Sequence, residues 1–347
     1  MEILQLGYEH LDALTDFARD PSVVRFGDHI SLTPRSAWAT WLAELDTNRV
    51  MTLAAFDGGR IRALARLTTT DRRRASHAGL VHVLAPWEDG DPAVDLVLGA
   101  LVDTADRWMQ LVRLELHAPA GHRRVAGVYA AHGFEIETTM RASISVANGF
   151  GDEVGLARIR APAPAPSDLV GPPLPPPRKG APSNLRIRAL DPEDAESWTR
   201  TLSDPTVIWG TLQLPHQRQE QWAERIRSGD PSRVLVLGAD VGGVIVAGSA
   251  LMISSALRRR HCARLGMHVS GPLQGRGIGR RLMNEALELA ETIGLRRIEL
   301  EVFGDNTRAV SLYESAGFEL EGMRRLTCYR EGALVDDLMM ARVLEGV

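Results

Sequence analysis

Three glycines and three arginines lie between residues 274 and 281, which read Gln-Gly-Arg-Gly-Ile-Gly-Arg-Arg. Apolar residues at helical spacing follow, with Leu282, Ala286 and Leu289 at i, i+4 and i+7. Glycine lets the main chain turn tightly and approach a ligand without a Cβ in the way. The unpaired N–H groups of a helix's first turn, with the positive end of its dipole, attract an anion. This segment therefore predicts a cradle for a pyrophosphate.

Two other phosphate-binding motifs do not fit this turn. A dinucleotide-binding Gly-x-Gly-x-x-Gly counted from Gly275 or Gly277 would need glycine where Arg280 or Leu282 stands. The Gly-Lys-Ser/Thr of a P-loop is absent. Taken alone, the segment also fits a glycine-rich connection that binds nothing, so a second motif is needed to decide.

That second motif lies at residues 305 to 318, which read Asp-Asn-Thr-Arg-Ala-Val-Ser-Leu-Tyr-Glu-Ser-Ala-Gly-Phe. Together with Gln274-x-x-Gly277-x-Gly279, in this order and at this spacing, it resembles the GCN5-related N-acetyltransferase (GNAT) family. The resemblance covers residues 185 to 343. Segments 211–216, 297–303 and 335–343 look most like bacterial amino-acid N-acetyltransferases. The resemblance implies transfer of an acetyl group from acetyl-CoA, bound as a co-substrate, to a primary amine.

The resemblance also assigns coenzyme contacts. The main chain of Met267, His268 and Val269 would pair with the pantetheine arm, and an N–H there would stabilise the oxyanion. The residues that would hold the pyrophosphate are Gln274, Gly275, Arg276, Gly277, Ile278, Gly279 and Arg280. Asn306 would contact the coenzyme beside the thioester, and Tyr313 would donate a proton to the departing thiolate. The alternative for Tyr313 is an aromatic side chain that packs a helix against the sheet.

The general base is marked less clearly, although the amine must lose a proton before it can attack. Enzymes of this family often carry an acid ten residues before the motif glutamine, where this chain has Arg264. The remaining candidate bases are His268, Glu301 and a chain of waters. The alternative for His268 is a purely structural role, and the alternative for Glu301 is a solvated or salt-bridged role. We hypothesise that Arg264 instead binds the carboxylate of an amino-acid acceptor.

Two further segments are expected to form the acceptor pocket. In this family the loop between the first two helices covers the amine, and here it spans residues 207–216 with Trp209 and Gln213. The hairpin near the C-terminus, with Tyr329 and Asp336, would form the opposite wall. Simple packing is the alternative role for these residues.

The chain consists of two similar halves joined by a proline-rich segment. Residues 161 to 182 contain nine prolines, which fix φ, lack an N–H donor and favour an extended linker. Landmarks repeat 184 residues apart, among them Trp38 and Trp222, Tyr129 and Tyr313, and Phe134 and Phe318. We expect two tandem GNAT-like domains, residues 1–157 and 185–347, with residues 158–184 as the linker.

Each domain is expected to be of the α/β class, with a central mixed, mostly antiparallel sheet flanked by helices. Alternating apolar residues and turn signals predict C-terminal strands at 185–190, 234–237, 244–252, 263–269, 297–303, 319–329 and 335–343. Helices are expected after Asp191-Pro192, from the glycine turn to a stop at Gly294, and over 308–316.

The N-terminal domain is predicted to be degenerate and non-catalytic. The segment aligned with the glycine turn, residues 88–93, reads Glu-Asp-Gly-Asp-Pro-Ala, so its acidic groups would repel a pyrophosphate and Pro92 lacks an N–H. His122 replaces Asn306, while Tyr129 is retained and fits hydrophobic packing. We expect an architectural role, as a cover for the active domain or a wall of the acceptor pocket.

Composition limits the partners. With 347 residues and a net charge of −4, the chain gives no electrostatic reason to expect nucleic acid or an anionic membrane. No apolar stretch is long enough to span a bilayer, and the start, MEILQLGYEH, lacks an export signal. Two cysteines provide neither a disulfide framework nor a metal cluster. We therefore expect a cytoplasmic protein without metal, either a monomer (a pseudo-dimer of two domains) or a homodimer.

Three functions remain open from the sequence. The first is acetylation of the primary amine of a small amino acid or amino-acid-like metabolite, by direct attack in a ternary complex with acetyl-CoA. The second is acetylation of a protein N-terminus, a peptide or an aminoacyl-tRNA, although a basic stripe for tRNA is missing. The third is a non-catalytic acyl-CoA sensor.

Overall fold

The computed structural model describes residues 1–24, 33–43, 49–70, 72–87, 91–160, 171–172 and 180–344. The chain divides into two compact units, Met1–Pro164 with Ala256–Arg258, and Ala165–Ser255 with Arg259–Val347. Most of the predicted linker, and residues 88–90 of the acidic segment, lie outside the described residues. No helix in the described part of the chain is long and apolar enough to cross a membrane.

The C-terminal unit is built on one mixed sheet. Its strands are β8 (Leu185–Ala189), β9 (Val234–Val241), β10 (Val244–Ile253), β11 (Cys262–Val269), β12 (Arg297–Phe303), β13 (Glu319–Arg330) and β14 (Ala333–Val343). They pair in the order β8-β9-β10-β11-β12-β14-β13. Neighbours run antiparallel except β11 and β12, which are parallel. The predicted mixed, mostly antiparallel sheet is therefore confirmed, and each predicted strand lies within a few residues of the observed one.

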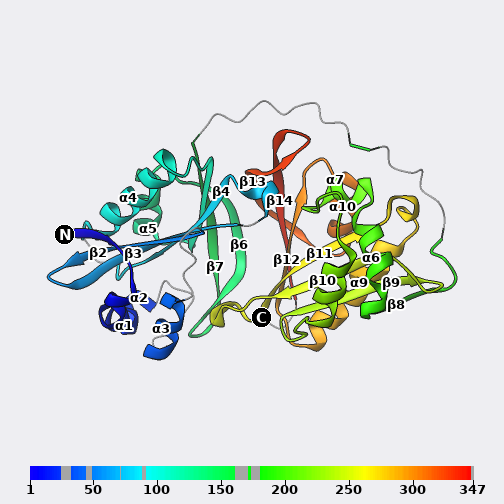
Figure 1. Cartoon of the computed structure of the whole chain (residues 1–347), viewed down its shortest axis with the longest axis horizontal. Coiled ribbons are helices and arrows are strands. Elements are labelled where there is room, and N and C mark those ends of the chain that lie inside the picture. Colours follow the sequence, from blue (N-terminus) through cyan, green and yellow to red (C-terminus); the bar gives the residue numbers. More distant parts are fainter. Residues whose placement is uncertain are drawn as a thin grey trace. The chain divides into compact units, whose positions relative to one another are not determined.

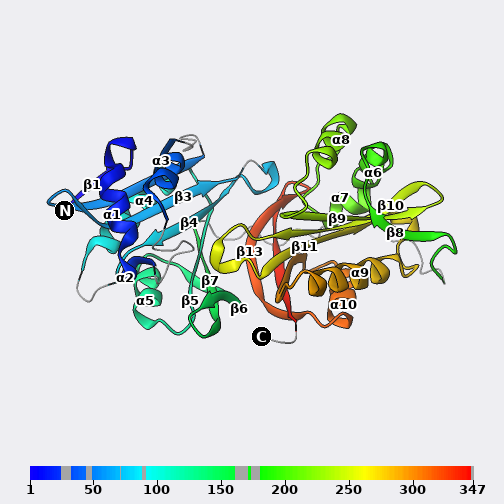
Figure 2. The same cartoon turned by 90° about the horizontal axis from the view of Figure 1, so that it is seen from below.

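Helices cover both faces of this sheet. They are α6 (Ala195–Leu202), α7 (Pro205–Gly210), α8 (Gln219–Arg227), α9 (Ile278–Thr292) and α10 (Thr307–Ser315). Figure 2 shows α6, α7 and α8 on one side of the sheet and α9 and α10 on the other. Buried Leu282, Met283, Ala286 and Leu287 give α9 its packed stripe, and Gly294 ends it at a φ of 81°. The helix stop predicted at this glycine is confirmed.

The one parallel pair separates soon after it forms. The recorded partners of β11 and β12 run only from Cys262–Arg297 to Arg264–Glu299. Along β11, the Ser270 N–H donates to Val246 O across the β10 side, at 3.0 Å. Main-chain groups alternate between the two sides of a strand, so those of Met267 and Val269 turn toward β12. In the described chain these two residues have no strand partner there, which leaves an open main-chain edge.

The N-terminal unit repeats this architecture (Figure 1). Its strands are β1 (Glu2–Gln5), β2 (Val50–Asp57), β3 (Arg60–Thr69), β4 (Ala78–Leu84), β5 (Arg113–Pro119), β6 (Glu135–Val146) and β7 (Gly149–Ile159). Its helices are α1 (Leu11–Arg19), α2 (Pro21–Val24), α3 (Arg35–Ala43), α4 (Ala93–Arg107) and α5 (Arg123–Ala131). The strand order is β1-β2-β3-β4-β5-β7-β6, with β4 and β5 parallel. Each unit thus has the same topology.

A buried ion pair repeats at the same offset. Arg113, whose side chain is 2% exposed, binds Glu137 at 2.8 Å. Arg297, fully buried, binds Glu321 at 2.6 Å, and both pairs are separated by 184 residues from their counterparts. A buried arginine is tolerated only when a carboxylate compensates its charge, so this pair is a specific shared feature and not a chance repeat.

Candidate active site

The first turn of α9 is open for an anion. Gly275 and Gly277 have φ values of 74° and 80°, in the left-handed region that favours glycine, and Gly277 is the N-cap. Arg281 is the first residue whose N–H bonds back, to Gly277 O at 3.2 Å. In the described part of the chain no side chain caps this helix. The N–H groups of Ile278, Gly279 and Arg280 are therefore left for a ligand.

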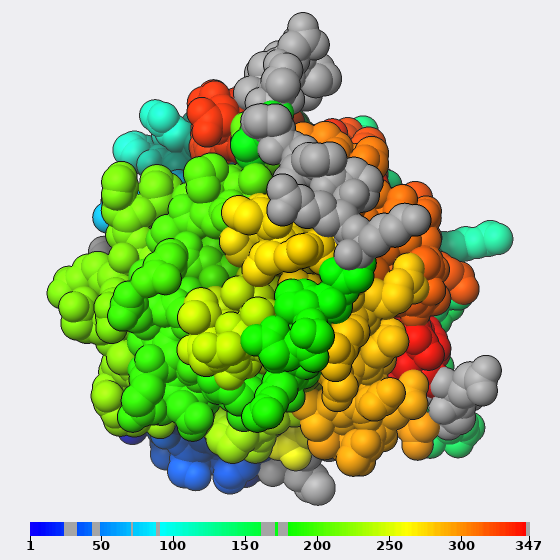
Figure 3. All heavy atoms as spheres, turned by 90° about the vertical axis from the view of Figure 1, so that its right-hand side faces the viewer, coloured from blue at the N-terminus to red at the C-terminus, as the bar shows by residue number. Residues whose placement is uncertain are grey.

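Arginines add positive charge around this turn. Arg280 and Arg281 are exposed, and Arg276 is half-buried. Arg280 Nη2 donates to Ser315 Oγ at 2.9 Å, which fixes its guanidinium between α9 and α10. Figure 3 shows gold atoms of this part of the sequence at the surface of the C-terminal unit. The turn combines open N–H groups with charge that complements a pyrophosphate.

The open edge of β11 adjoins this turn. Gln274, which opens the turn, donates from Nε2 to Val269 O at 2.9 Å. An extended chain such as a pantetheine arm pairs with an exposed strand edge through main-chain hydrogen bonds. The alternation of β11 turns the main-chain groups of Met267 and Val269 to this edge, whereas the main chain of His268 faces Gly248 of β10. Of the three residues predicted to pair with the pantetheine arm, Met267 and Val269 have their main-chain groups at the open edge. Their contact with the coenzyme stays a prediction.

Tyr313 and Asn306 both lie on α10. Asn306 is its N-cap, with Oδ1 accepting the Ala309 N–H at 3.2 Å. Tyr313 is 7% exposed and its ring lies 6.0 Å from that of Phe318. Among the described residues its hydroxyl makes no hydrogen bond, and burial raises the pKa of Tyr313 to about 12. The phenol therefore keeps its proton at neutral pH and has a free donor.

His268 is packed against an indole. Its ring lies 4.8 Å from Trp198 at an interplanar angle of 73°. Gly248, its cross-strand neighbour, leaves room for this contact, because a Cβ there would lie 2.2 Å from Trp198 Cζ3. Burial lowers the pKa of His268 to about 4. Such an imidazole is neutral at pH 7 and is a weak base for an ammonium group, which favours the structural interpretation.

Glu301 is held by two arginines. Arg324 lies 3.0 Å from its carboxylate and Arg264 lies 3.5 Å away. Arg324 also pairs with Asp337, at 2.9 Å. Two guanidiniums thus occupy this carboxylate, which favours the salt-bridged alternative for Glu301. The Arg264 side chain remains 40% exposed, so it can still meet a ligand carboxylate.

Arg330 joins the C-terminal hairpin to the loop over residues 207–216, which is expected to cover the acceptor. The sequence analysis did not single out this arginine. The Arg330 guanidinium lies 4.3 Å from the ring centroid of Trp209 and 4.8 Å from that of Phe303. Asp305 holds it with two hydrogen bonds, of 3.1 and 2.5 Å. Asp305 directly precedes Asn306 in the second motif. This position was the one sequence signal that a charged partner such as Arg330 should be sought there. Arg330 thus joins α7 to the start of α10.

Three other residues were expected near the acceptor, namely Gln213, Tyr329 and Asp336. Gln213 donates its main-chain N–H to Thr211 Oγ1 at 3.2 Å, and Tyr329 is 41% exposed. Asp336 accepts the Leu326 N–H at 2.8 Å inside the β13–β14 hairpin. This bond gives Asp336 a role in folding the hairpin. The acceptor roles of Gln213 and Tyr329 stay predictions.

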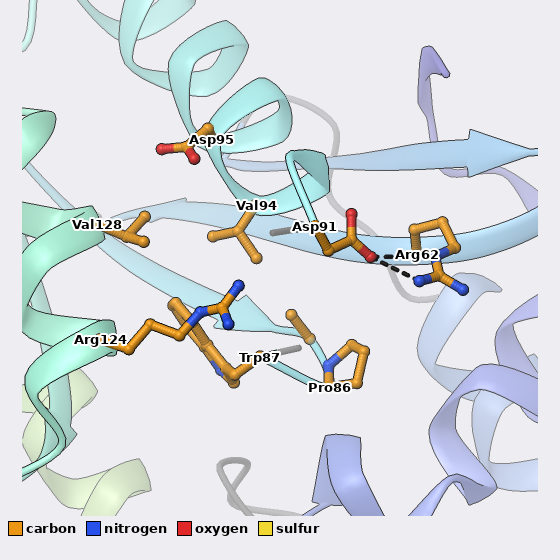
Figure 4. A pocket seen from close by; sticks show the side chains of 9 residues that line it. Arg62, Pro86, Trp87, Asp91, Val94, Asp95, Arg124 and Val128 are labelled. Atoms are coloured by element: carbon orange, nitrogen blue, oxygen red, sulfur yellow. Dashed lines mark hydrogen bonds and ion pairs between the residues drawn. The ribbon is translucent and has the colours of Figure 1, made fainter. Parts of the chain in front are cut away.

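In the N-terminal unit a small pocket lies at the start of α4, lined by Trp87, Asp91 and Arg124 among others (Figure 4). Asp91 Oδ1 accepts the Ala93 N–H at 2.9 Å at the start of α4, and its carboxylate pairs with Arg62 at 2.7 Å. Trp87, 8% exposed, lies 5.6 Å from the ring of Tyr129. The remaining cavity has a volume of about 30 Å³, which is the space of a water molecule or two. An indole and a carboxylate thus line the start of α4, where α9 has the glycines and arginines of its turn.

Metal ligands do not gather in the described residues. No group of three or more His, Cys, Asp or Glu side chains there is placed to hold a metal ion. The chemistry that the described C-terminal groups offer is anion binding, main-chain pairing and proton donation.

Known proteins resemble the C-terminal region of the chain. The profile of the acetyltransferase (GNAT) family matches residues 195–318. The L-amino acid N-acetyltransferase AaaT of Escherichia coli K12 is 34% identical over 162 residues, covering 46% of this chain and 99% of that protein. A mycothiol acetyltransferase of Beutenbergia cavernae is 36% identical over 98 residues, 27% of this chain and 32% of its own length. A solved GNAT-family acetyltransferase from Streptococcus pneumoniae has a TM-score of 0.43 at 26% identity, covering 46% of this chain and 99% of that one.

Proposed function

Because the chain belongs to the GNAT acetyltransferase family, we propose that its C-terminal unit acetylates the primary amine of a small amino acid or amino-acid-like metabolite, with acetyl-CoA as the donor. The observation that carries this proposal is the uncapped first turn of α9 beside the open edge of β11. The turn offers N–H groups to the pyrophosphate, and the edge offers main-chain groups to the pantetheine arm. Together they would bring the thioester to the end of β11.

The proposed reaction is direct attack in a ternary complex. The nitrogen lone pair of the deprotonated amine forms a bond to the thioester carbonyl carbon, and the carbonyl oxygen becomes an oxyanion. A main-chain N–H at the open edge of β11, from Met267 or Val269, stabilises that oxyanion. The C–S bond then breaks, the nitrogen loses its proton to water, and the sulfur leaves as a thiolate that accepts a hydrogen bond from Tyr313.

A water chain is the proposed route for the proton that the amine must lose. The side chains of His268 and Glu301 are poor bases in this structure, the first because its pKa is about 4 and the second because two arginines hold it. Water that reaches the acceptor side needs no perturbed side chain to carry the proton away.

The amino-acid acceptor is supported by two observations. The relative AaaT acts, by its name, on L-amino acids, and this chain spans 99% of its length. Arg264 presents a part-exposed guanidinium on the strand that carries the coenzyme edge, where it could pair with an α-carboxylate. A peptide or protein N-terminus lacks that carboxylate next to the amine.

A thiol-release assay tests the acceptor class. Purified full-length chain with acetyl-CoA is offered the free amino acids one by one, then peptides with the same N-terminal residues. We expect release of coenzyme A with free amino acids and at least about tenfold lower kcat/KM with the matching peptides, the loss of one charge-assisted pair. Faster turnover of the peptides would move the function to N-terminal acetylation. Tight acetyl-CoA binding with no turnover of either would favour the sensor.

We further propose that residues 185–347 are the catalytic domain and residues 1–157 an architectural one, joined by the linker 158–184. The support is the shared topology of the two units and, in the first, the Asp91 carboxylate and the small cavity at the start of α4. A cytoplasmic location and a self-sufficient monomer remain expectations from the sequence.

A further inference from the structure

Three hydrogen bonds join the start of α7 to the loop between β11 and α9, and a fourth links the two α7 residues that make them. Asp204 Oδ2 accepts from the Ser270 hydroxyl at 3.1 Å and from the Gly271 N–H at 3.0 Å. Thr206 Oγ1 donates to Asp204 Oδ1 at 2.6 Å and accepts from Gln274 Nε2 at 3.1 Å. These bonds form a closed ring, here called the α7 tether, of Asp204, Thr206, Ser270, Gly271 and Gln274.

Close packing accompanies these bonds. A Cβ added to Gly271 would lie 2.9 Å from Thr206 Oγ1 and 3.2 Å from Asp204 Oδ1. Burial alone would raise the pKa of Asp204, but hydrogen bonds from Thr206, Gly271 and Ser270 hold it below its ordinary value. Asp204 is therefore charged at neutral pH, and its bonds are of the stronger charge-assisted kind. The loop and the helix are in direct contact without space for a side chain between them.

The two ends of the tether carry different parts of the site. Gln274 opens the glycine turn and also binds Val269 O at the coenzyme edge. At the other end, α7 carries Trp209, which lies against Arg330, and ends at Gly210. A Cβ at Gly210 would lie 3.2 Å from Asn306 Nδ2, so α7 ends beside the N-cap of α10. The tether thus connects the coenzyme grip to the wall proposed for the acceptor.

The N-terminal unit provides an internal comparison. Ser22, 184 residues before Thr206, donates its N–H and hydroxyl to Asp20 Oδ1, at 2.8 and 2.6 Å. The local turn is therefore common to the two units. The residues 184 positions before Ser270 and Gly271 are Pro86 and Trp87, and proline has neither a hydroxyl nor an N–H to donate. A proline at this position cannot make the bond that the Ser270 hydroxyl makes to Asp204.

We propose that the α7 tether transmits coenzyme binding to the acceptor pocket, with Thr206, Asp204 and Gln274 as positioning residues. This inference rests on the proposed function. When the glycine turn binds the pyrophosphate, residues 270–274 lose conformational freedom. Because the ring of hydrogen bonds connects them to α7, α7 loses conformational freedom as well. Trp209 is then already ordered when the amine binds, so acceptor binding loses less conformational entropy.

Hydrogen exchange on the full-length chain tests this proposal, with coenzyme A as the probe. In the wild type, we expect coenzyme A to slow exchange in the peptide over residues 278–283 and in the peptide over residues 206–216, each by at least about fivefold. Thr206→Val keeps the shape but removes the hydroxyl. It should keep the protection at 278–283 and reduce that at 206–216 to less than about twofold. Thr206→Ser, which keeps the hydroxyl, should behave like the wild type.

Ser22→Ala is the matched control, since it removes the equivalent local bond from the other unit and should change neither peptide. Protection of the wild type at 278–283 but not at 206–216 would overturn the tether, as would a Thr206→Val chain with full protection at both. Absence of protection at 278–283 in the wild type would instead count against the proposed function. If Thr206→Val does not fold, Ser270→Ala and Gln274→Met each break one side of the ring and must lower protection at 206–216.

Discussion

Replacing the phenol of Tyr313 separates a proton donor from a packing residue. Tyr313→Phe removes one oxygen from a side chain that is 7% exposed. The hydroxyl has no hydrogen-bond partner among the described residues, so its loss leaves no orphaned group. The free energy of unfolding should change by less than about 1 kcal/mol. Any loss of turnover then reports on the reaction and not on the fold.

The size of that loss follows from the pKa of Tyr313, about 12. A coenzyme A thiol has an ordinary pKa of about 8.5, so complete transfer to a solvated thiolate is uphill by about 3.5 units, or about 5 kcal/mol. Tyr313 therefore acts mainly as a hydrogen-bond donor to the developing thiolate. We expect a fall in kcat of about 100-fold, at the lower end of general-acid effects and equal to about 2.7 kcal/mol.

Steady-state thiol release gives kcat, and calorimetry gives the Kd of acetyl-CoA, which should stay within about threefold because the phenol acts on the sulfur only as it leaves. Tyr129→Phe is the matched control, because Tyr129 is 3% exposed and also lies 6.0 Å from a phenylalanine ring, that of Phe134. It should leave kcat unchanged. Retention of kcat by Tyr313→Phe, or an equal fall in both variants, would refute a chemical role for Tyr313.

Three further predictions concern the turn, the histidine and the acceptor. Gly277→Asp puts a carboxylate at the N-terminus of α9 on a residue with a φ of 80°, so melting should fall through about 1 kcal/mol of strain, while calorimetry shows acetyl-CoA affinity at least about tenfold below that of Gly277→Asn, which has the same strain without the charge; equal affinities of the two variants would rule out this turn as the phosphate site. His268 has a folded pKa of about 4, below its ordinary 6.5, so its neutral form stabilises the fold fully above pH 6.5 and that stability is lost as pH falls toward 4. Denaturant unfolding should show the wild type losing about 2 kcal/mol more than His268→Gln between pH 7.5 and 5, and parallel losses would contradict the buried neutral state. Arg264→Ala should raise the KM of a free amino-acid acceptor about tenfold while that of acetyl-CoA stays constant, and an unchanged acceptor KM would remove Arg264 from the pocket.

Local signals predicted much of the fold. The positive φ of Gly275 and Gly277 was predictable because glycine adopts that conformation at low cost, and the stop of α9 at Gly294 follows the same rule. Alternating apolar residues predicted the strands because one face of the sheet is buried. The position of Tyr313 on a short helix followed from the motif. These features depend on residues close together in the chain.

Contacts between distant residues could not be predicted in this way. Asp204 accepts a hydrogen bond from Gly271, 67 positions later in the chain, and Arg330 of β13 stacks on Trp209 of α7. Hydrogen bonds and stacking of this kind leave no period in the sequence, since they depend on how whole elements pack. The pairing of Glu301 with Arg264 and Arg324 has the same origin, which is why Glu301 could be proposed as a base from the sequence.

An unfinished helix end makes the ligand a component of the fold. In α9 the N–H groups of the first turn are left for a ligand, whereas at the start of α4 Asp91 accepts one N–H, that of Ala93. A ligand at 100 times its Kd adds about 2.7 kcal/mol to the stability of the form that binds it. The C-terminal unit should therefore resist proteolysis better with acetyl-CoA than without it, which limited proteolysis of the full-length chain would measure.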